Sequence, residues 1–388
     1  MRIAHVIPYL NPKRGGDVNF CSQLACQQAK NNHQVTILTT DFEMDSNFKI
    51  SLESKGIKVV MIRCSANLGL FLISRSMSTW FRKNSNLIDI IHLHDFRSYQ
   101  NVVSHRWAVK NRIPYVLQAH GSLLPLSEKT RLKMLYDLLW KRNVLADASF
   151  LIALSTYEAS QYSSMKVEKD RIVIVPTGAI VPAERDAPKR GSFRRKYGIG
   201  PDEMVVLYVG RLHRSKGVEL LTKAFFDVSE HIRDARLIIM GPDFGDRPVI
   251  EEILRSSSFG SRAILTGFVS EEERAAAFID SDVFVTPSYS GFPSTFLEAC
   301  SYGVPIITTT KGDTLDWIDG KVGYVVDYSE NCLRDAMLEL LTNQNSREDF
   351  SRNGKGIVRT RFDWGNVASA IEAIYIESIE RQSICGGK

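Results

Sequence analysis

The hydrophobic positions of the chain gather in short runs separated by segments with helical spacing. The runs are almost continuously apolar and rich in Val and Ile, which is typical of parallel strands buried on both faces. In the first half of the chain these runs are Arg2–Tyr9, His33–Thr40, Ile57–Arg63, Leu87–His94, Pro114–His120 and Ser149–Ser155. In the second half they are Met204–Gly210, Ala235–Pro242, Ala263–Val269, Asp282–Ser288 and Val304–Thr310. The pattern predicts an α/β protein in which the strand–helix alternation occurs twice.

The segment between the two halves, residues 176–202, is rich in Pro, Gly and charged residues, as linkers are. We place the domain boundary near Pro182, so that the N-terminal domain covers residues 1–182 and the C-terminal domain covers residues 183–365. The remaining residues, 366–388, are predicted to form an amphipathic C-terminal helix and tail.

Composition narrows the class of protein. With 388 residues, 44% hydrophobic and 24% charged, the chain is globular and long enough for two cores. A net charge of +5 suits anionic ligands or an anionic membrane surface but is no signature of nucleic-acid binding. The six cysteines show no spacing of a metal site, and no apolar run reaches a membrane span of about 18 residues. We expect a cytoplasmic protein with reduced thiols.

Ligands of open parallel sheets bind beyond the carboxyl ends of the strands, so the loops after the strands are the candidate sites. Gly15 and Gly16 follow the first strand and precede a helix, which suits either an anion or an ordinary turn. His120 ends a strand before Gly121, where it can point into a cleft or serve a structural role.

Two cations follow the first strand of the second half. Arg211 and Lys216 flank a short loop before a helix that begins near Val218. Fixed cations beside the positive end of a helix dipole make a diphosphate clamp, and the alternative is two solvated charges. The strand–loop–helix position favours the clamp.

The stretch from Ser288 to Ile307 combines a glycine turn with one acid, Glu298, on a short helix. Thr295 and Glu298 have the spacing of a capping box, which is the structural interpretation. The functional interpretation is that Glu298 accepts hydrogen bonds from a ribose diol.

These segments together resemble the two donor-binding segments of the retaining family-4 glycosyltransferases. The similar segments are YVGRLHRSKGVELLTKAF, PSYSGFPSTFLEACSYGVPII, LTGFVSEEERAAAF, QAHG, VPTGA and the N-terminal GG loop, in the family's order. The resemblance implies the GT-B fold, in which an N-terminal acceptor-binding and a C-terminal nucleotide-sugar-binding Rossmann-like domain face each other across a cleft. It also implies that the C-terminal helix packs back on the N-terminal domain.

The resemblance assigns roles residue by residue. Arg211 and Lys216 would hold the diphosphate and stabilise the departing nucleotide, Glu298 would bind the ribose, and His120 would lie beside the sugar and the reacting bond. The further donor-binding positions that it implies are Gly16 near the diphosphate or acceptor, Phe268 and Val269 near the base, and Ser290, Gly291, Phe292 and Pro293 around the sugar and phosphate. The family usually has an acid where this chain has Ser290, so the donor contacts or the rate differ there.

The resemblance implies a retaining glycosyltransferase, with hexosyl transfer from a UDP- or GDP-linked sugar and no further cofactor. A front-face displacement would let the leaving phosphate take the acceptor proton. A sugar or lipid-linked glycan acceptor fits the family's part in cell-surface polysaccharide and glycolipid biosynthesis. The alternatives are a GT-B sugar-nucleotide epimerase and a non-catalytic sugar-nucleotide-binding homologue.

Two further segments leave alternatives open. Asp280 and Asp282 imitate an Asp-x-Asp metal motif, but we interpret them as a solvated turn and predict no metal site. Residues 127–145, with Trp80 to Lys83, combine apolar and basic side chains at helical spacing. Such segments pack on their own domain or rest peripherally on anionic lipid at the inner face of the cell membrane.

Overall fold

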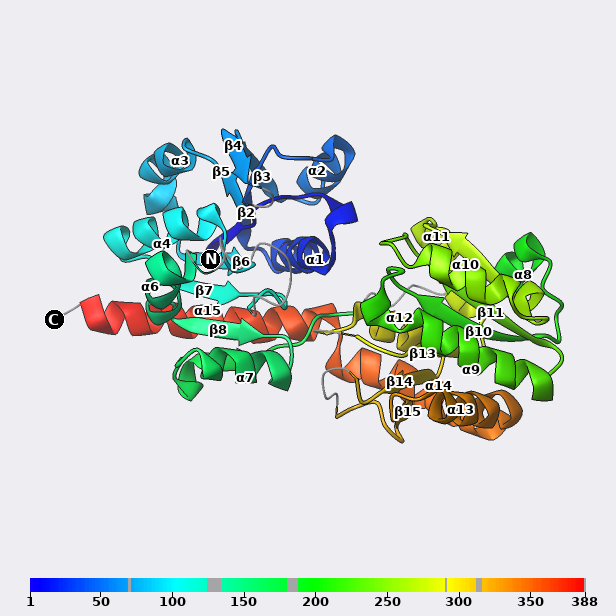
Figure 1. The fold of residues 1–388 in the computed structure, drawn as a ribbon. Coiled ribbons are helices and arrows are strands. Elements are labelled where there is room, and N and C mark those ends of the chain that lie inside the picture. Colours follow the sequence, from blue (N-terminus) through cyan, green and yellow to red (C-terminus); the bar gives the residue numbers. More distant parts are fainter. Residues whose placement is uncertain are drawn as a thin grey trace. The chain divides into compact units, whose positions relative to one another are not determined.

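The computed structural model describes residues 1–68, 71–123, 134, 136–179, 188–289, 292–311 and 316–386. The chain divides into two compact units, each built around a parallel sheet (Figure 1). Unit 1 comprises Met1–Gly178 and Trp364–Lys388, and unit 2 comprises Ala179–Asp363. The expected boundary after residue 182 falls among residues 180–187, which lie outside the described part of the chain.

Unit 1 has a seven-stranded sheet in which the sequence order reverses beside β1. In spatial order its strands are β3 (Lys58–Ile62), β2 (Gln34–Thr40), β1 (Arg2–Val6), β6 (Ile90–His94), β7 (Tyr115–Gln118), β8 (Phe150–Ala153) and β9 (Ile172–Ile174). Every paired neighbour is parallel, as the continuous apolar runs predict. A separate antiparallel pair is formed by β4 (Ala66–Leu68) and β5 (Phe71–Ile73).

Helices cover both faces of this sheet. One face packs against α3 (Met77–Asn84), α4 (Tyr99–Asn111), α6 (Arg142–Ala146) and α7 (Thr156–Ser164). The other packs against α1 (Gly16–Lys30), α2 (Ser46–Glu53) and α15 (Trp364–Gly386). The sheet is therefore the middle layer of a three-layer Rossmann-like unit.

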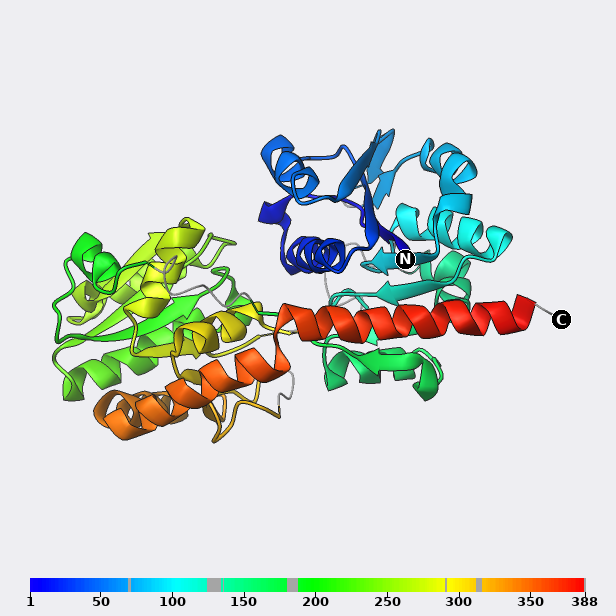
Figure 2. The ribbon, with the colours of Figure 1, turned by 180° about the vertical axis from the view of Figure 1, so that it is seen from behind.

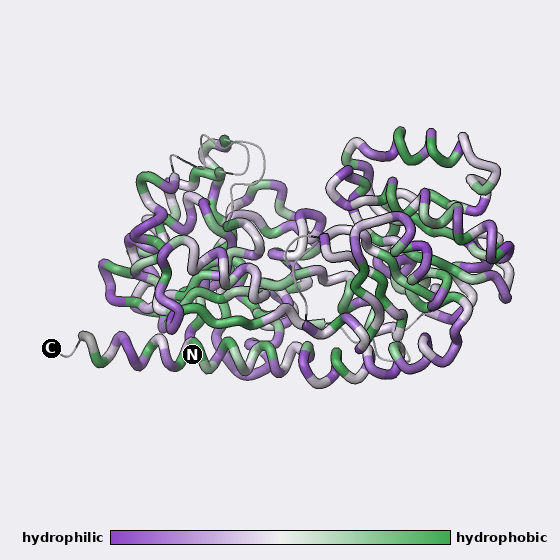
Figure 3. The backbone as a smooth tube through the Cα atoms, turned by 60° about the horizontal axis from the view of Figure 1, so that its bottom comes forward, coloured by the Kyte–Doolittle hydropathy of each residue, from purple (hydrophilic) through white to green (hydrophobic). Residues whose placement is uncertain are grey.

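The C-terminal helix α15 belongs to unit 1, as expected. It contacts α1, β6 and β7, and it runs along the sheet in both ribbon views (Figures 1 and 2). Val367, Ala368, Ile371, Ile374 and Tyr375 are buried, and this spacing places them on one face of the helix. Hydropathy colouring shows α15, which leads to the C-terminus, as alternating hydrophilic and hydrophobic stretches (Figure 3).

Unit 2 repeats the architecture with six parallel strands. In spatial order they are β12 (Ala263–Gly267), β11 (Ala235–Met240), β10 (Met204–Val209), β13 (Val283–Thr286), β14 (Ile306–Thr309) and β15 (Gly323–Val326). One face packs against α9 (Val218–His231), α10 (Arg247–Arg255) and α13 (Glu330–Thr342). The other packs against α8 (Ser192–Tyr197), α11 (Glu271–Ile279), α12 (Ser294–Tyr302) and α14 (Gln344–Arg361).

Helix α8 lies inside the segment that the sequence indicated as a linker. Phe193 is buried in the core of unit 2, so this part of the segment is structured because an apolar side chain anchors it. Among the described residues, no helix combines the length and the apolarity that a membrane crossing requires.

Candidate functional site

A polar pocket of unit 2 lies where the strand order reverses. β10 and β13 are neighbours, and the chain leaves them at the same edge of the sheet. A pocket of about 460 Å³ lies at this point, and it is lined by Arg214, Ser215, Lys216, Ser288, Tyr289 and Lys311. Three of these side chains are basic, so the pocket suits an anion.

Lys216 is a half-buried cation of this pocket. It ends η6 (Arg214–Lys216), the short turn between β10 and α9. Burial and the neighbouring charge of Arg211 lower the pKa of the Lys216 ammonium. The charged form is thus disfavoured until an anion offsets the burial and the repulsion.

A glycine and a tyrosine fix the position of this turn. Gly217 has φ +71°, and a Cβ there would lie 2.8 Å from the Tyr328 hydroxyl and 3.0 Å from Cβ of Pro287. Only glycine fits both the backbone conformation and the close packing. The Tyr328 ring also lies 3.9 Å from Nζ of Lys311, so it contacts both lysine-bearing loops.

Arg211 is placed differently from Lys216. Its guanidinium is exposed and lies over the Phe244 ring, 5.3 Å from the centroid, and Arg211 does not line the pocket. It is nevertheless close enough to lower the pKa of Lys216. The two predicted cations therefore interact, but only one of them lines the pocket.

Lys311 is a candidate that the sequence interpretation missed. It follows β14, the neighbour of β13, and this adjacency brings its ammonium into the pocket. The signal was present, because Lys311 stands two residues after a strand end, as Arg211 does. Only the strand order shows that the two loops meet.

Glu298 is not part of a capping box. Helix α12 begins at Ser294 with Pro293 at its N-cap, and no side-chain cap is formed within the described residues. Thr295 is thus already inside the helix. Instead, Oε2 of Glu298 accepts from Nε of Arg274 at 2.9 Å, and the Glu298 side chain is 30% exposed. Burial raises the pKa of Glu298, and the charge of Arg274 opposes this shift.

The other predicted donor contacts of unit 2 differ in exposure. Phe268, in the loop after β12, is 73% exposed, whereas the adjacent Val269 packs against the core. The ring of Phe292 packs beside Trp317 and Phe362. Ser290 and Gly291 lie outside the described residues.

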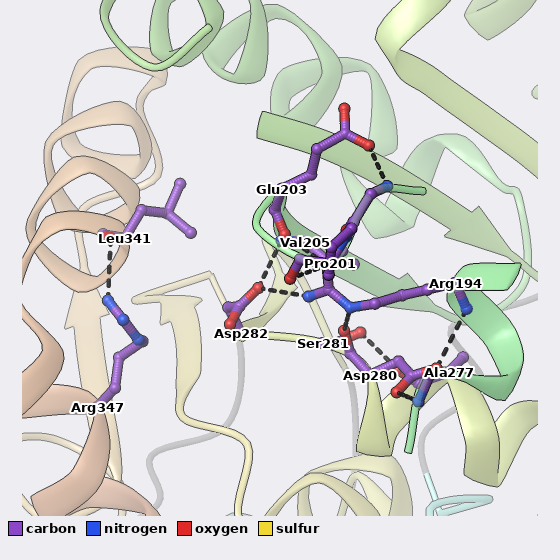
Figure 4. A network of polar contacts seen from close by, with 12 residues as sticks. Arg194, Pro201, Glu203, Val205, Ala277, Asp280, Ser281, Asp282, Leu341 and Arg347 are labelled. Atoms are coloured by element: carbon purple, nitrogen blue, oxygen red, sulfur yellow. Dashed lines mark hydrogen bonds and ion pairs between the residues drawn. The ribbon is translucent and has the colours of Figure 1, made fainter. Parts of the chain in front are cut away.

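The Asp-x-Asp sequence is a buried anchor, so its interpretation as a solvated turn was wrong. Asp280 accepts from the backbone amides of Gly191, Phe193 and Arg194. Asp282 accepts from the Arg194 guanidinium at 3.1 Å and from the Val205 amide at 2.7 Å (Figure 4). Both carboxylates hold α8 against the sheet, which explains why two acids occur in an otherwise apolar stretch.

In unit 1 the strand order reverses between β1 and β6, and the glycine loop lies there. Gly15 has φ +146°, which favours glycine, whereas a Cβ on Gly16 would meet open space. The space beside the Gly16 backbone is thus open. Asp17 stands in the first turn of α1, and burial together with the charge of Asp17 raises the pKa of Asp95 well above its usual range.

His120 ends the loop after β7 with φ +52°, a conformation uncommon outside glycine. The adjacent Gly121 amide donates to Oε1 of Glu158 at 2.7 Å, which fixes this turn. Nε2 of His120 lies 2.9 Å from Nδ1 of His94, and the ring packs edge-on against Phe20. Burial lowers the pKa of His120 to about 4, so the ring is neutral at pH 7.

Comparison with known proteins places the chain in a family. Residues 189–356 match Glycosyl transferases group 1, and residues 15–178 match Glycosyl transferase 4-like domain. The chain is 26% identical to an uncharacterized glycosyltransferase of Methanocaldococcus jannaschii, covering 98% of this chain and 99% of that protein. It is 27% identical to a phosphatidyl-myo-inositol mannosyltransferase of Mycobacterium leprae, covering 97% and 96%.

The fold has a counterpart among solved structures. HepE of Anabaena, solved in complex with UDP and glucose, superimposes with a TM-score of 0.74 at 17% identity, covering 96% of this chain and 98% of that one. The two family matches together span most of both Rossmann-like units. The chain therefore belongs to the group 1, family-4-like glycosyltransferases, which have the GT-B fold.

Proposed function

We propose that this glycosyltransferase moves a hexosyl group from a nucleoside-diphosphate sugar to a glycan or lipid-linked acceptor with retention of anomeric configuration. The observation that carries the proposal is the cationic pocket of unit 2, where Lys216 and Lys311 converge beside the N-terminus of α9. A diphosphate supplies the two adjacent negative charges that such a pocket can accept.

The largest contribution to catalysis is the stabilisation of negative charge on the departing diphosphate. Lys216 has a lowered pKa because burial and Arg211 disfavour its charge, and negative charge developing on the phosphate relieves both costs. Gly217 leaves the first amides of α9 without a side-chain cap, so the positive end of the helix dipole adds to the two lysines.

Residues on either side of this lysine pocket hold the nucleoside. Glu298 accepts from the ribose hydroxyls, and its ion pair with Arg274 keeps the carboxylate oriented. The exposed Phe268 ring stacks on the base, and Val269 supports that loop from the core. These roles are assigned by family resemblance. The same resemblance implies a UDP- or GDP-linked donor, with uracil or guanine as its base.

The transfer step proceeds by front-face displacement. The acceptor oxygen bonds to the anomeric carbon on the side from which the phosphate oxygen departs, and the acceptor proton passes to that phosphate oxygen. His120 lies beside the sugar as a neutral imidazole, because burial lowers its pKa to about 4. It therefore positions a hydroxyl group and carries no formal charge at neutral pH.

The acceptor binds to unit 1 and comes from an anionic membrane. Within η3 (Asp137–Lys141), Leu138 is 81% exposed although the nearby Tyr136 is buried. The helical segment thus packs on its own unit with one face and leaves an apolar face for lipid. A pocket of about 310 Å³ opens near it, lined by Phe71, Ile73, Ser78, Tyr99, Val102, Val103, Arg106, Trp107 and Trp140. Aromatic rings with one Arg suit a lipid-linked glycan of cell-surface assembly.

A thermal-shift panel with UDP, GDP, ADP, CDP and TDP tests the donor proposal. A ligand at about 100 times its Kd stabilises the fold by roughly 2.7 kcal/mol, so one base is expected to raise Tm clearly. The corresponding sugar nucleotide is then incubated with acceptors, and NMR follows the anomeric proton. Isomerised sugar formed without acceptor would instead indicate an epimerase, and binding without turnover a non-catalytic homologue.

A membrane-flotation assay tests the acceptor proposal separately. Vesicles with anionic phosphatidylglycerol should carry the protein upward in low salt, whereas pure phosphatidylcholine vesicles should not. Leu138→Ser is expected to weaken this binding without lowering Tm, because the side chain is exposed. Equal flotation with both vesicle types would contradict an electrostatic membrane contact.

A further inference from the structure

Unit 1 contains a row of histidines that neither the sequence interpretation nor the proposed transfer step uses. His5 on β1 lies opposite His92 on β6 in the strand register, and His94 is two residues farther along β6. Side chains two residues apart share one face of a sheet, so all three rings lie on the face covered by α1 and α15. All three are fully buried.

His5 and His94 form a continuous hydrogen-bonded chain that ends at His120, whereas His92 bonds to Tyr375 instead. Nδ1 of His94 lies 2.9 Å from Nε2 of His120, and Nε2 of His94 lies 2.9 Å from Nδ1 of His5. At the inner end, Nε2 of His5 lies 2.7 Å from Oε1 of Gln28 on α1. The chain therefore connects the buried amide of Gln28 with the ring beside the candidate sugar site.

Burial keeps the rings of this chain neutral. The pKa of His5 and of His120 is lowered to about 4, and the pKa of His94 is lowered well below its usual value by burial and by His92. A neutral imidazole has one donor and one acceptor nitrogen. Each ring must therefore donate to one neighbour and accept from the other. Only two arrangements of the protons along the chain are possible.

Gln28 selects the direction. Its Oε1 can only accept, so His5 donates from Nε2 and accepts at Nδ1. His94 then donates from Nε2 and accepts at Nδ1, and His120 donates from Nε2. Nδ1 of His120 is left as the acceptor. If the Gln28 amide were reversed, every proton in the chain would move to the other nitrogen.

Helix α15 holds the Gln28 amide in this orientation. Nε2 of Gln28 lies 3.5 Å from the Tyr375 hydroxyl, which lies 2.6 Å from Nδ1 of His92. The amide thus donates to the hydroxyl while its oxygen faces His5. By packing on unit 1, the C-terminal helix therefore helps to set the direction of the hydrogen bonds between the histidines.

A metal site is the competing interpretation of these residues. Ligand atoms of His5, Cys21 and His94 lie within 4.8 Å of one another. The facing nitrogens of His5 and His94 are already hydrogen-bonded to each other, and burial raises the pKa of the Cys21 thiol well above its usual value. The hydrogen-bonded chain uses the same atoms without requiring a thiolate.

We propose that Gln28 is a positioning residue that fixes His120 in the tautomer protonated at Nε2, so that Nδ1 accepts a hydrogen bond from a hydroxyl of the transferred sugar. The tautomer assignment rests on the geometry of unit 1 alone. Its catalytic consequence rests on the proposed function, in which His120 lies beside that sugar.

Long-range ¹H–¹⁵N NMR of the full-length protein with ¹⁵N-labelled histidine tests the tautomer directly. The shifts of the two ring nitrogens show which one carries the proton, and His120→Ala identifies the His120 signals. We expect wild-type His120 to be protonated at Nε2 at pH 7.5. Protonation at Nδ1, or an equal mixture, would overturn the proposal even without a variant.

Two substitutions of Gln28 test its role. Gln28→Glu keeps an acceptor facing His5 and should preserve the tautomer. Gln28→Met keeps a similar volume without that acceptor and should give a mixture at His5, His94 and His120. An unchanged His120 tautomer in folded Gln28→Met would contradict the role of Gln28.

Kinetics separate this inference from the proposed function. Gln28→Met should lower kcat/KM by about two- to tenfold, the scale of one neutral hydrogen bond, and Gln28→Glu should recover most of that loss. If His120→Ala left kcat/KM unchanged, the placement of His120 beside the sugar would be wrong. The NMR result would still decide whether Gln28 sets the tautomer.

Discussion

The two units place polar side chains at the same point of the same topology, but the two sites have opposite electrostatic character. In unit 2 the reversal between β10 and β13 carries Lys216 and Lys311. In unit 1 the reversal between β1 and β6 carries Asp17 and Asp95 beside a neutral His120, and the pKa of Asp95 is raised by burial and by Asp17. The fold thus determines where a ligand can bind, and a few residues after each strand determine which charge it can have.

The difference also shows how burial is used in each unit. In unit 2, burial disfavours the charge of Lys216, and an anionic ligand would offset this cost. In unit 1, burial keeps a chain of hydrogen-bonded histidines neutral. The pocket of unit 2 thereby suits an anionic group, and the histidines of unit 1 suit neutral hydrogen-bonding groups.

Removing the half-buried Lys216 of unit 2 should have the largest effect. Lys216→Ala is expected to cost roughly 2–4 kcal/mol of transition-state stabilisation, because the charge acts on the departing diphosphate. The measurement is kcat/KM with the donor named by the nucleotide panel. Lys223→Ala is the control, since Lys223 is exposed on α9, the helix that follows Lys216, and pairs with Glu219. Losses of kcat/KM of similar size in both variants would contradict the assignment of Lys216 to the diphosphate.

Acid should destabilise unit 1 more than unit 2. His5 and His120 have folded-state pKa values of about 4, below an unfolded value of 6.5. The unfolded chain therefore binds more protons between these values, and stability present above pH 6.5 is lost as pH falls toward 4. At pH 5 the loss is on the order of 2 kcal/mol for each ring.

Hydrogen exchange measured by mass spectrometry at pH 7 and pH 5, corrected for intrinsic rates, compares the acid sensitivity of the two units. Protection should drop in β1 and β6 but much less in β10 and β13. His213 and His231 in unit 2 are exposed, so that unit is an internal control. An equal drop in both units would show that the buried histidines do not govern acid sensitivity.

Glu298→Gln tests whether this acid serves a ligand or the fold. The variant keeps a hydrogen-bonding side chain, and α12 does not depend on Glu298 for its N-cap. Nucleotide affinity should fall by about 1–2 kcal/mol, while Tm changes little, because a charged acceptor is lost. Glu272→Gln, at an exposed acid on α11, should leave affinity unchanged. A lower Tm with unchanged binding would favour a structural role.

The smallest effect is expected at Ser290. Ser290→Ala should raise the barrier by about 0.5–1.5 kcal/mol if the hydroxyl contacts the sugar. Ser290→Glu should lower activity with the native donor, because an unpaired charge at the sugar is costly. Both variants are compared by kcat/KM with one donor and one acceptor. A large gain in Ser290→Glu would mean that this chain is a weakened family member.

The sequence predicted most of the fold because most strands of the two large sheets are local apolar runs, but it did not indicate β9 or β15. It also drew attention to Lys216 and His120, since both lie in loops that follow a strand. It could not place Lys311 or Arg274, because their contacts depend on which strands and helices become neighbours.

One error and one omission have the same physical origin. Asp280 and Asp282 were interpreted as solvated because acids usually are, but α8 supplies a backbone amide to Asp280 and the Arg194 guanidinium to Asp282. His92 and His94 were counted as part of a strand, and their hydrogen bonds depend on the register with β1 and on α15. Polar side chains inside a core cannot be assigned before their partners are known.

Isothermal titration of a nucleoside diphosphate, compared with its parent nucleoside, tests the central claim about unit 2 most directly. The account predicts that Lys216→Ala and Lys311→Ala each weaken binding of the diphosphate at least tenfold, about 1.4 kcal/mol, while nucleoside binding stays within twofold of wild type. Equal weakening of both ligands would mean that the lysines support the fold of the pocket. Unchanged binding of the diphosphate would show that its site lies elsewhere.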